Sequence, residues 1–169
     1  MSNFHSLISS ANKCKLKNDY YSALKIYEQA LSLNKKNIDL MYEIASIHRS
    51  LGDLKKAKQF YLEIIKKEPA NTKSHRMLSS LFDYKFEDDH LNIMLKLFNS
   101  KKLNHVKLID LEFALGKAYE DKEDYELSFK HFKNANDKKY EMTGSNIENL
   151  EKHFSQILET FQKINFNMA

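Results

Sequence analysis

Residues 51–71, LGDLKKAKQFYLEIIKKEPAN, decide the fold of this chain. Within them, Ala57, Tyr61 and Ile64 are spaced i, i+4 and i+7, so they lie on one face of an α-helix. Pro69 follows at a point where a helix has to stop, because proline lacks the amide hydrogen that continues it. The stretch predicts a helix that packs closely through small residues placed around an aromatic ring.

The same pattern recurs along the chain, which predicts a helical repeat array. Residues 4–37 align without a gap on residues 38–71, a shift of 34 positions, and the matched pairs are Ala11 and Ala45, Asp19 and Asp53, Ala23 and Ala57, Tyr27 and Tyr61, and Asn37 and Asn71. A further copy lies 71 positions after the second, with Gly116, Asp124, Ser128 and Phe132 in the places of Ala45, Asp53, Ala57 and Tyr61. A third unit is therefore expected between them, with one helix over residues 72–85 and another that carries Leu91, Met94, Leu95 and Phe98.

These repeats resemble a known family. Residues 16–37, 51–71 and 113–136 look like the second half of a tetratricopeptide repeat (TPR), although Lys35 stands where the second unit has Pro69 and Cys14 stands where an aromatic residue is usual. The resemblance implies an all-α fold, a TPR-like α-solenoid of four helical hairpins with a C-terminal capping helix. The array would span residues 1–140, in units of about 4–37, 38–71, 72–108 and 109–140.

The C-terminal segment, residues 145–166, is predicted to be a capping or linker helix. Ser145 and Glu148 form a capping box, and an apolar stripe at helical spacing follows them. Repeat arrays need such a cap, because their last hairpin otherwise exposes a face that a neighbour would cover. A partner-binding role of this helix, and self-association through Phe154, Phe161 and Phe166, remain open, although we favour a monomer.

Residues 72–166 also resemble the TPR region that precedes the catalytic domain in bacterial TPR-sulfotransferase proteins. That domain would contain a glycine-containing loop for the phosphate of the sulfonate donor. The chain ends at Ala169, and its three glycines, Gly52, Gly116 and Gly144, are too far apart for a phosphate-binding loop. We therefore expect no enzymatic activity, with the alternative that the chain is the N-terminal portion of a sulfotransferase whose catalytic domain is absent.

Composition narrows the remaining function classes. The single cysteine, the mean hydropathy of −0.61 and the absence of a long apolar run predict a cytoplasmic protein without a membrane partner. Residues 1–76 carry 14 Lys and Arg against 7 Asp and Glu, whereas residues 77–169 carry 13 against 16, and no nucleic-acid-binding module is recognisable. No two of the seven histidines are three or four positions apart, so we expect no metal, no cofactor and no catalytic residues.

A protein or peptide partner is the expected ligand. The first helix of each hairpin lines the concave groove of a TPR stack, and the face opposite the buried stripe carries basic, polar and aromatic side chains. An acidic peptide could bind there through charge-assisted hydrogen bonds. The same residues also suit the polar lining that any solvated groove needs. The candidate groove residues are Asn12, Lys15, Tyr42, Ser46, Arg49, Lys73, Arg76 and Ser80.

Overall fold

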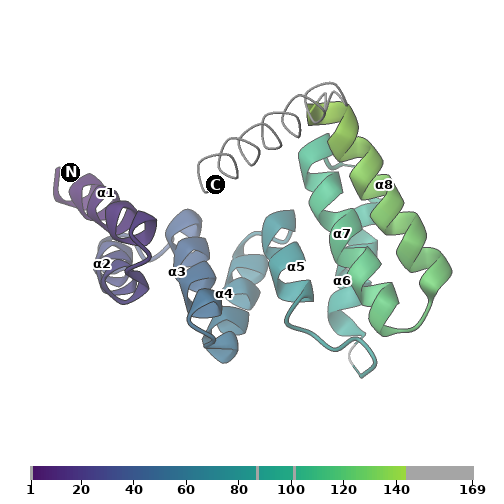
Figure 1. The fold of residues 1–169 in the computed structure, drawn as a ribbon, viewed down its shortest axis with the longest axis horizontal. Helices are drawn as coiled ribbons and strands as arrows, with labels where there is room; N and C mark the ends of the chain where they lie inside the picture. Colours follow the sequence, from purple (N-terminus) through teal and green to yellow (C-terminus); the bar gives the residue numbers. More distant parts are fainter. Residues whose placement is uncertain (1, 87, 101, 144–169) are drawn as a thin grey trace, which may run out of the picture.

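The fold is all-α, as predicted. A computed structural model of the chain describes residues 2–86, 88–100 and 102–143, and this part contains eight α-helices and no strand (Figure 1). The helices are α1 (Ser2–Leu16), α2 (Tyr20–Leu33), α3 (Ile38–Ser50), α4 (Leu54–Lys67), α5 (Thr72–Ser79), α6 (Asp89–Asn99), α7 (His105–Asp121) and α8 (Tyr125–Thr143).

Successive helices stack into a solenoid. Close pairs form between α1 and α2, between α3 and α4, and between α7 and α8, and each of α2 and α4 also packs on the helix that follows it. In Figure 1 the pairs succeed one another along the longest axis, from the purple α1 to the green α8. The predicted TPR-like α-solenoid is confirmed.

Short side chains start the helices. The carboxylates of Asp19, Asp53 and Asp124, the matched aspartates of the repeat, accept hydrogen bonds from backbone N–H groups of Ser22, Lys56 and Leu127 and so cap the second helices. Asparagines do the same for the first helices, where Asn37, Asn71 and Asn104 accept from Leu40, Ser74 and Lys107. Asp88 or Asp89 was a candidate cap of α6; Asp88 precedes the helix, but its side chain makes no capping bond and instead pairs with Lys122 at 2.6 Å.

The turns inside the hairpins repeat as well. Asn18, Gly52 and Glu123 occupy matching positions, and each has a positive φ of 60° to 80°. Glycine adopts this left-handed conformation without strain, which explains Gly52 in the tight turn between α3 and α4. The backbone N–H of the aspartate that follows each of these residues donates to the carbonyl of Cys14, His48 or Tyr119, respectively. The same turn geometry is therefore built from three different residues.

The small residues on the repeat stripe permit close helix packing. Ala23, Ala57 and Tyr61 are fully buried, as is Tyr27. In the last hairpin, a Cβ added to Gly116 would lie 2.8 Å from a ring carbon of Phe132, and the Ser128 hydroxyl donates to the Gly116 carbonyl. Gly116, which takes the small-residue position of Ala45, thus marks a close contact between α7 and α8.

The third unit differs from its prediction. The first helix, α5, ends at Ser79 instead of Lys85. The hydroxyls of Ser79 and Ser80 donate to carbonyls of their own last turn, which competes with continuation of the helix. The chain then turns and buries Tyr84 completely. Both α5 and α6 pack on α7, and they meet each other mainly through buried side chains.

The predicted capping helix, residues 145–166, lies outside the described residues. Among the helices that are described, none is both long enough and apolar enough to cross a bilayer.

Candidate functional site

Helices α1, α3, α5 and α7 follow one another along the solenoid, and we call the surface that they form the first-helix face (Figure 1). Side chains of the predicted groove link each of these helices to the next. These links join Lys15 to Glu43, Lys73 to Tyr42, and Arg76 to both Asp110 and Phe113. The structure thus brings most of the predicted groove residues together, although it does not test what they bind.

Between α3 and α5 the link is a cation over an aromatic ring. The Lys73 ammonium lies 3.9 Å from the centroid of the half-buried Tyr42 ring. Tyr42 in turn makes an edge contact with the ring of Tyr61, with the ring centroids 5.7 Å apart. Burial raises the pKa of the Tyr42 hydroxyl, so the hydroxyl stays protonated at neutral pH.

Between α5 and α7 the link is an ion pair combined with a stacked cation. The Arg76 guanidinium lies 3.2 Å from an Asp110 carboxylate oxygen and 4.3 Å from the centroid of the Phe113 ring. Asp110 therefore already balances most of the charge of Arg76. Of the basic residues predicted for the groove, Arg76 is among the least available to a new anion.

The candidates on α1 also have partners within the chain. Asn12 accepts a hydrogen bond from the hydroxyl of the buried Tyr27. Lys15 pairs with the Glu43 carboxylate, and although burial alone would lower the pKa of the Lys15 ammonium, the hydrogen bond and charge of Glu43 raise it. Asn12 is thus tied to α2 and Lys15 to α3, so both have partners within the chain before a ligand binds.

The remaining candidates lie in different places. Arg49 is exposed on α3, and Ser46 is half-buried one turn before it. Ser80 was expected on the face of a longer helix, but it follows the last residue of α5, where its hydroxyl bonds to the Met77 carbonyl. Because α5 is short, Ser80 does not continue the row that Lys73 and Arg76 begin.

One residue of this surface was missed as a site residue from the sequence. Tyr61 was assigned to the core, and it is fully buried, but its hydroxyl has no hydrogen-bond partner among the described residues. Burial raises the pKa of this hydroxyl to about 12. The signal that could have identified it is the exchange of Asn12 for Ser46 at matching positions of the first two units.

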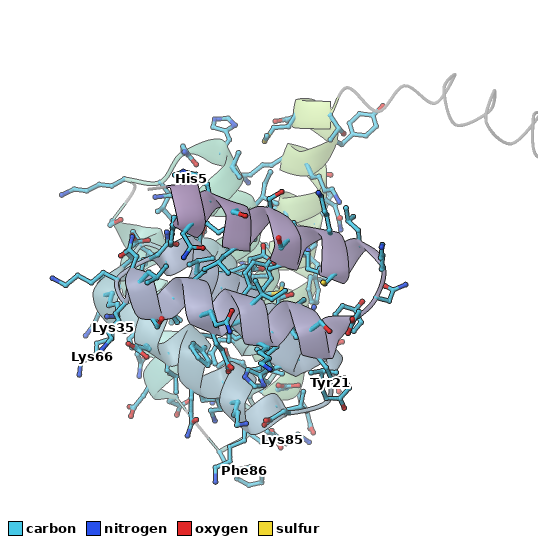
Figure 2. The ribbon with its side chains drawn as sticks, turned by 90° about the vertical axis from the view of Figure 1, so that its left-hand side faces the viewer. His5, Tyr21, Lys35, Lys66, Lys85 and Phe86 are labelled. Carbon is cyan, nitrogen blue, oxygen red and sulfur yellow. The ribbon has the colours of Figure 1, made fainter. Side chains whose placement is uncertain are left out.

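Two hollows flank the third unit. One, of about 590 Å³, lies between the α4–α5 connection and the start of α7, and it is lined by residues that include Lys73, Lys107 and Asp110. The other, of about 570 Å³, is lined by residues of α4, α6 and the segment between α5 and α6, including Phe82 and the 85% exposed Phe86. Figure 2 shows Phe86 at the opposite edge of the molecule from His5 of α1.

A buried polar chain connects α5 to α6. His75 and His90 are stacked, with the His75 Nδ1 atom 2.9 Å from the His90 Nε2 atom. Since the Pro69 carbonyl can only accept, His75 Nε2 carries a proton and donates to it, and we infer that His90 Nε2 donates to His75 Nδ1. The remaining atom, His90 Nδ1, then accepts from the Tyr84 hydroxyl at 2.6 Å. All three bonds are satisfied with both rings neutral.

This histidine pair is not arranged as a metal site. Its facing nitrogen atoms are hydrogen-bonded to each other, so no space for an ion remains between them. Across the three described ranges, no group of three or more His, Cys, Asp and Glu side chains could hold a metal ion.

Comparison with known proteins shows a match over part of the repeat array. A family model described as tetratricopeptide repeat matches residues 16–81. This range covers the second half of the first unit, the whole second unit and α5. No curated protein sequence matches the chain.

Solved structures extend the likeness along more of the chain. MamA from Desulfovibrio magneticus RS-1 aligns with a TM-score of 0.63 at 15% identity and covers 96% of this chain and 97% of its own. A tetratricopeptide repeat protein from Parabacteroides merdae has a TM-score of 0.62 at 20% identity, over 87% of this chain and 56% of its own. BtubC from P. vanneervenii has a TM-score of 0.61 at 16% identity, over 85% and 65%. At these identities the likeness is one of fold.

Proposed function

We propose that this chain, which carries tetratricopeptide repeats and folds as a TPR α-solenoid, is a non-catalytic scaffold module that binds a segment of a protein partner. TPR solenoids are in general protein-binding modules, because stacked hairpins create an extended surface for a ligand. A cytoplasmic location belongs to the same proposal. No observation favours the sulfotransferase-linked alternative.

The observation that carries the proposal is the row of cations and aromatic rings on α3, α5 and α7. Tyr42 and Phe113 each lie under a cation of α5, so one helix links the rings of its two neighbours. Arginine and tyrosine are also the side chains that contribute most binding free energy in protein interfaces. We place the partner segment along this row, on the concave side expected from the sequence.

Charge indicates the kind of partner. Within residues 2–86, 88–100 and 102–143, neither Arg49 nor Lys73 forms an ion pair, whereas Lys15 and Arg76 do. A partner segment that carries Asp or Glu would supply the missing carboxylates. We therefore propose an acidic peptide segment as the ligand of the first-helix face.

A peptide array tests this function. Random twelve-residue peptides are printed with amidated and with free C-termini and probed with the wild type and with an Arg49→Ala/Lys73→Ala variant. We expect the wild type to select peptides rich in Asp and Glu. The variant should bind these peptides with an affinity lower by about tenfold or more, since a charge-assisted hydrogen bond contributes about 1.5–3 kcal/mol.

The matched control is Lys35→Ala/Lys66→Ala. It removes the same charge from two exposed lysines, both of which are labelled on the left-hand side of Figure 2. Binding that falls equally in both variants would show a general charge effect in place of a site. If the wild type selects no peptides, the proposed function is wrong.

A further inference from the structure

Two tyrosines at matching repeat positions have different partners. Tyr27 and Tyr61 are 34 positions apart, and both are fully buried. The Tyr27 hydroxyl donates to the side-chain oxygen of Asn12 on the first-helix face. The residue that matches Asn12 in the second unit is Ser46, whose side chain is shorter, and the Tyr61 hydroxyl is left without a partner in the described part of the chain.

An unpartnered buried hydroxyl is unusual. Most buried polar side-chain atoms in proteins have a hydrogen-bond partner, and leaving one unpaired costs about 1–3 kcal/mol. Folding alone gives no reason to keep this hydroxyl, because phenylalanine would fill the same space. A partner from outside the chain would give one.

The Tyr61 ring contacts the first-helix face at Tyr42 of α3. The charged groups that influence the pKa of the Tyr61 hydroxyl are Arg49 and Glu43, both on α3. The Tyr27 hydroxyl, its counterpart in the first unit, reaches a residue on this face. Of the two charged neighbours, Glu43 is already paired with Lys15, so Arg49 is the neighbour that is left to bind an anion.

Among the described residues, the cations nearby have no acidic partner. Arg49 forms no ion pair with a described residue, and Lys73 contacts only the face of the Tyr42 ring. Because the pKa of Tyr61 is about 12, its hydroxyl carries a proton to donate at neutral pH. Two unbalanced positive charges and a free donor therefore surround Tyr42, between α3 and α5.

We propose that Tyr61, Arg49 and Ser46 form a carboxylate subsite. In it, the ligand oxygen takes the place that the Asn12 side-chain oxygen fills in the first unit. The Tyr61 and Ser46 hydroxyls donate to one carboxylate, the Arg49 guanidinium pairs with it, and Lys73 lies at the edge. This subsite rests on the proposed function, since the carboxylate belongs to the bound peptide.

Entry to the subsite requires a side-chain movement. The Tyr61 hydroxyl is shielded from water, and Tyr42 is the ring that packs beside it. Rotation of Tyr42, together with release of Lys73 from its ring, is a change of the size that side chains commonly undergo on binding.

The test uses the tightest peptide selected from the array, with its affinity measured by fluorescence anisotropy. Tyr61→Phe removes only the hydroxyl and is expected to weaken binding about tenfold or more, the loss of a hydrogen bond to a charged group. Ser46→Asn supplies the internal acceptor that Asn12 provides in the first unit, and it should weaken binding by a similar factor. The control, Tyr27→Phe, removes the matching hydroxyl that already has a partner and should leave the affinity unchanged.

Variants of the peptide identify which of its carboxylates is bound. The same peptide is remade with each Asp or Glu changed to its amide, and with a free or an amidated C-terminus. One of these changes should abolish the difference between wild type and Tyr61→Phe, and it identifies the bound carboxylate.

The experiment distinguishes failure of the carboxylate subsite from failure of the proposed function. If peptides bind the first-helix face but Tyr61→Phe and Ser46→Asn bind as the wild type does, the subsite is wrong and the proposed function stands. If no peptide binds at all, both are wrong.

Discussion

The second and third units of the solenoid are held together by different interactions. In the second unit, α3 and α4 pack directly around Ala45, Ala57 and Tyr61. In the third unit, α5 and α6 are joined by the buried chain from His75 through His90 to Tyr84. Small residues let the backbones of α3 and α4 approach closely, whereas α5 and α6 meet mainly through the side chains of the polar chain.

The two units should therefore respond differently to substitution and to acid. The contacts among Ala45, Ala57 and Tyr61 are apolar, and none of these side chains takes up a proton in acid. A hydrogen-bonded chain of neutral histidines depends on the presence of every member and on the neutral state of both rings, because an unpaired or charged group in a buried position is costly. Three predictions follow from this contrast.

The largest effect is expected from Tyr84→Ala. This change removes a fully buried ring and the donor to His90, and it should lower the free energy of unfolding by about 3–5 kcal/mol. Urea titration followed by far-ultraviolet circular dichroism measures the change. A loss below about 1 kcal/mol would show that the third unit does not depend on this side chain.

Acid should weaken the third unit selectively. Burial lowers the pKa of His75 and of His90, and that of His90 to about 3, with the positive charge of nearby Lys58 adding to the effect. The unfolded chain takes up these protons near pH 6.5, so the free energy of unfolding is constant above about pH 7 and falls as the pH decreases toward 3. At pH 5, His90 alone should lower the free energy of unfolding by about 2 kcal/mol relative to its value above pH 7.

The control for the acid effect is His90→Gln, in which this titrating group is absent. Its free energy of unfolding should change less between pH 7 and pH 5 than that of the wild type. An identical pH dependence in both proteins would assign the acid sensitivity to other groups, among them His48, whose pKa is also lowered by burial.

The same contrast explains what the sequence could predict. The stripe of Ala57, Tyr61 and Ile64 at helical spacing identifies the hairpins, and the matched aspartates identify the starts of their second helices, because both depend on residues close together in the chain. The end of α5 at Ser79 is different. It accompanies the hydrogen bonds of the Ser79 and Ser80 hydroxyls to their own last turn and the burial of Tyr84 against His90, and this tertiary contact has no periodic signal.

The candidate site shows the same division. Helical periodicity alone was enough to select Tyr42, Lys73 and Arg76 as residues of one surface. Which cations would be balanced within the chain could not be predicted, because the pairing of Arg76 with Asp110 depends on the direct packing of α5 on α7.

The smallest effects separate the hydroxyls of two buried tyrosines. Tyr84→Phe leaves the His90 Nδ1 atom without a donor and should cost about 1.5 kcal/mol of the free energy of unfolding. Tyr61→Phe removes a hydroxyl with no partner in the described part of the chain, and it should change that free energy by less than about 0.5 kcal/mol or increase it.

Equal losses of unfolding free energy in Tyr84→Phe and Tyr61→Phe would contradict the contrast between the second and third units. They would mean that the Tyr61 hydroxyl also has a hydrogen-bond partner in the free protein. Tyr27→Phe provides the intermediate case, because its hydroxyl donates to the exposed Asn12, which water can satisfy once the tyrosine hydroxyl is gone. Its expected cost is about 0.5–1 kcal/mol. The order Tyr84, Tyr27, Tyr61 follows from how deeply each acceptor is buried and from whether the described part of the chain supplies an acceptor.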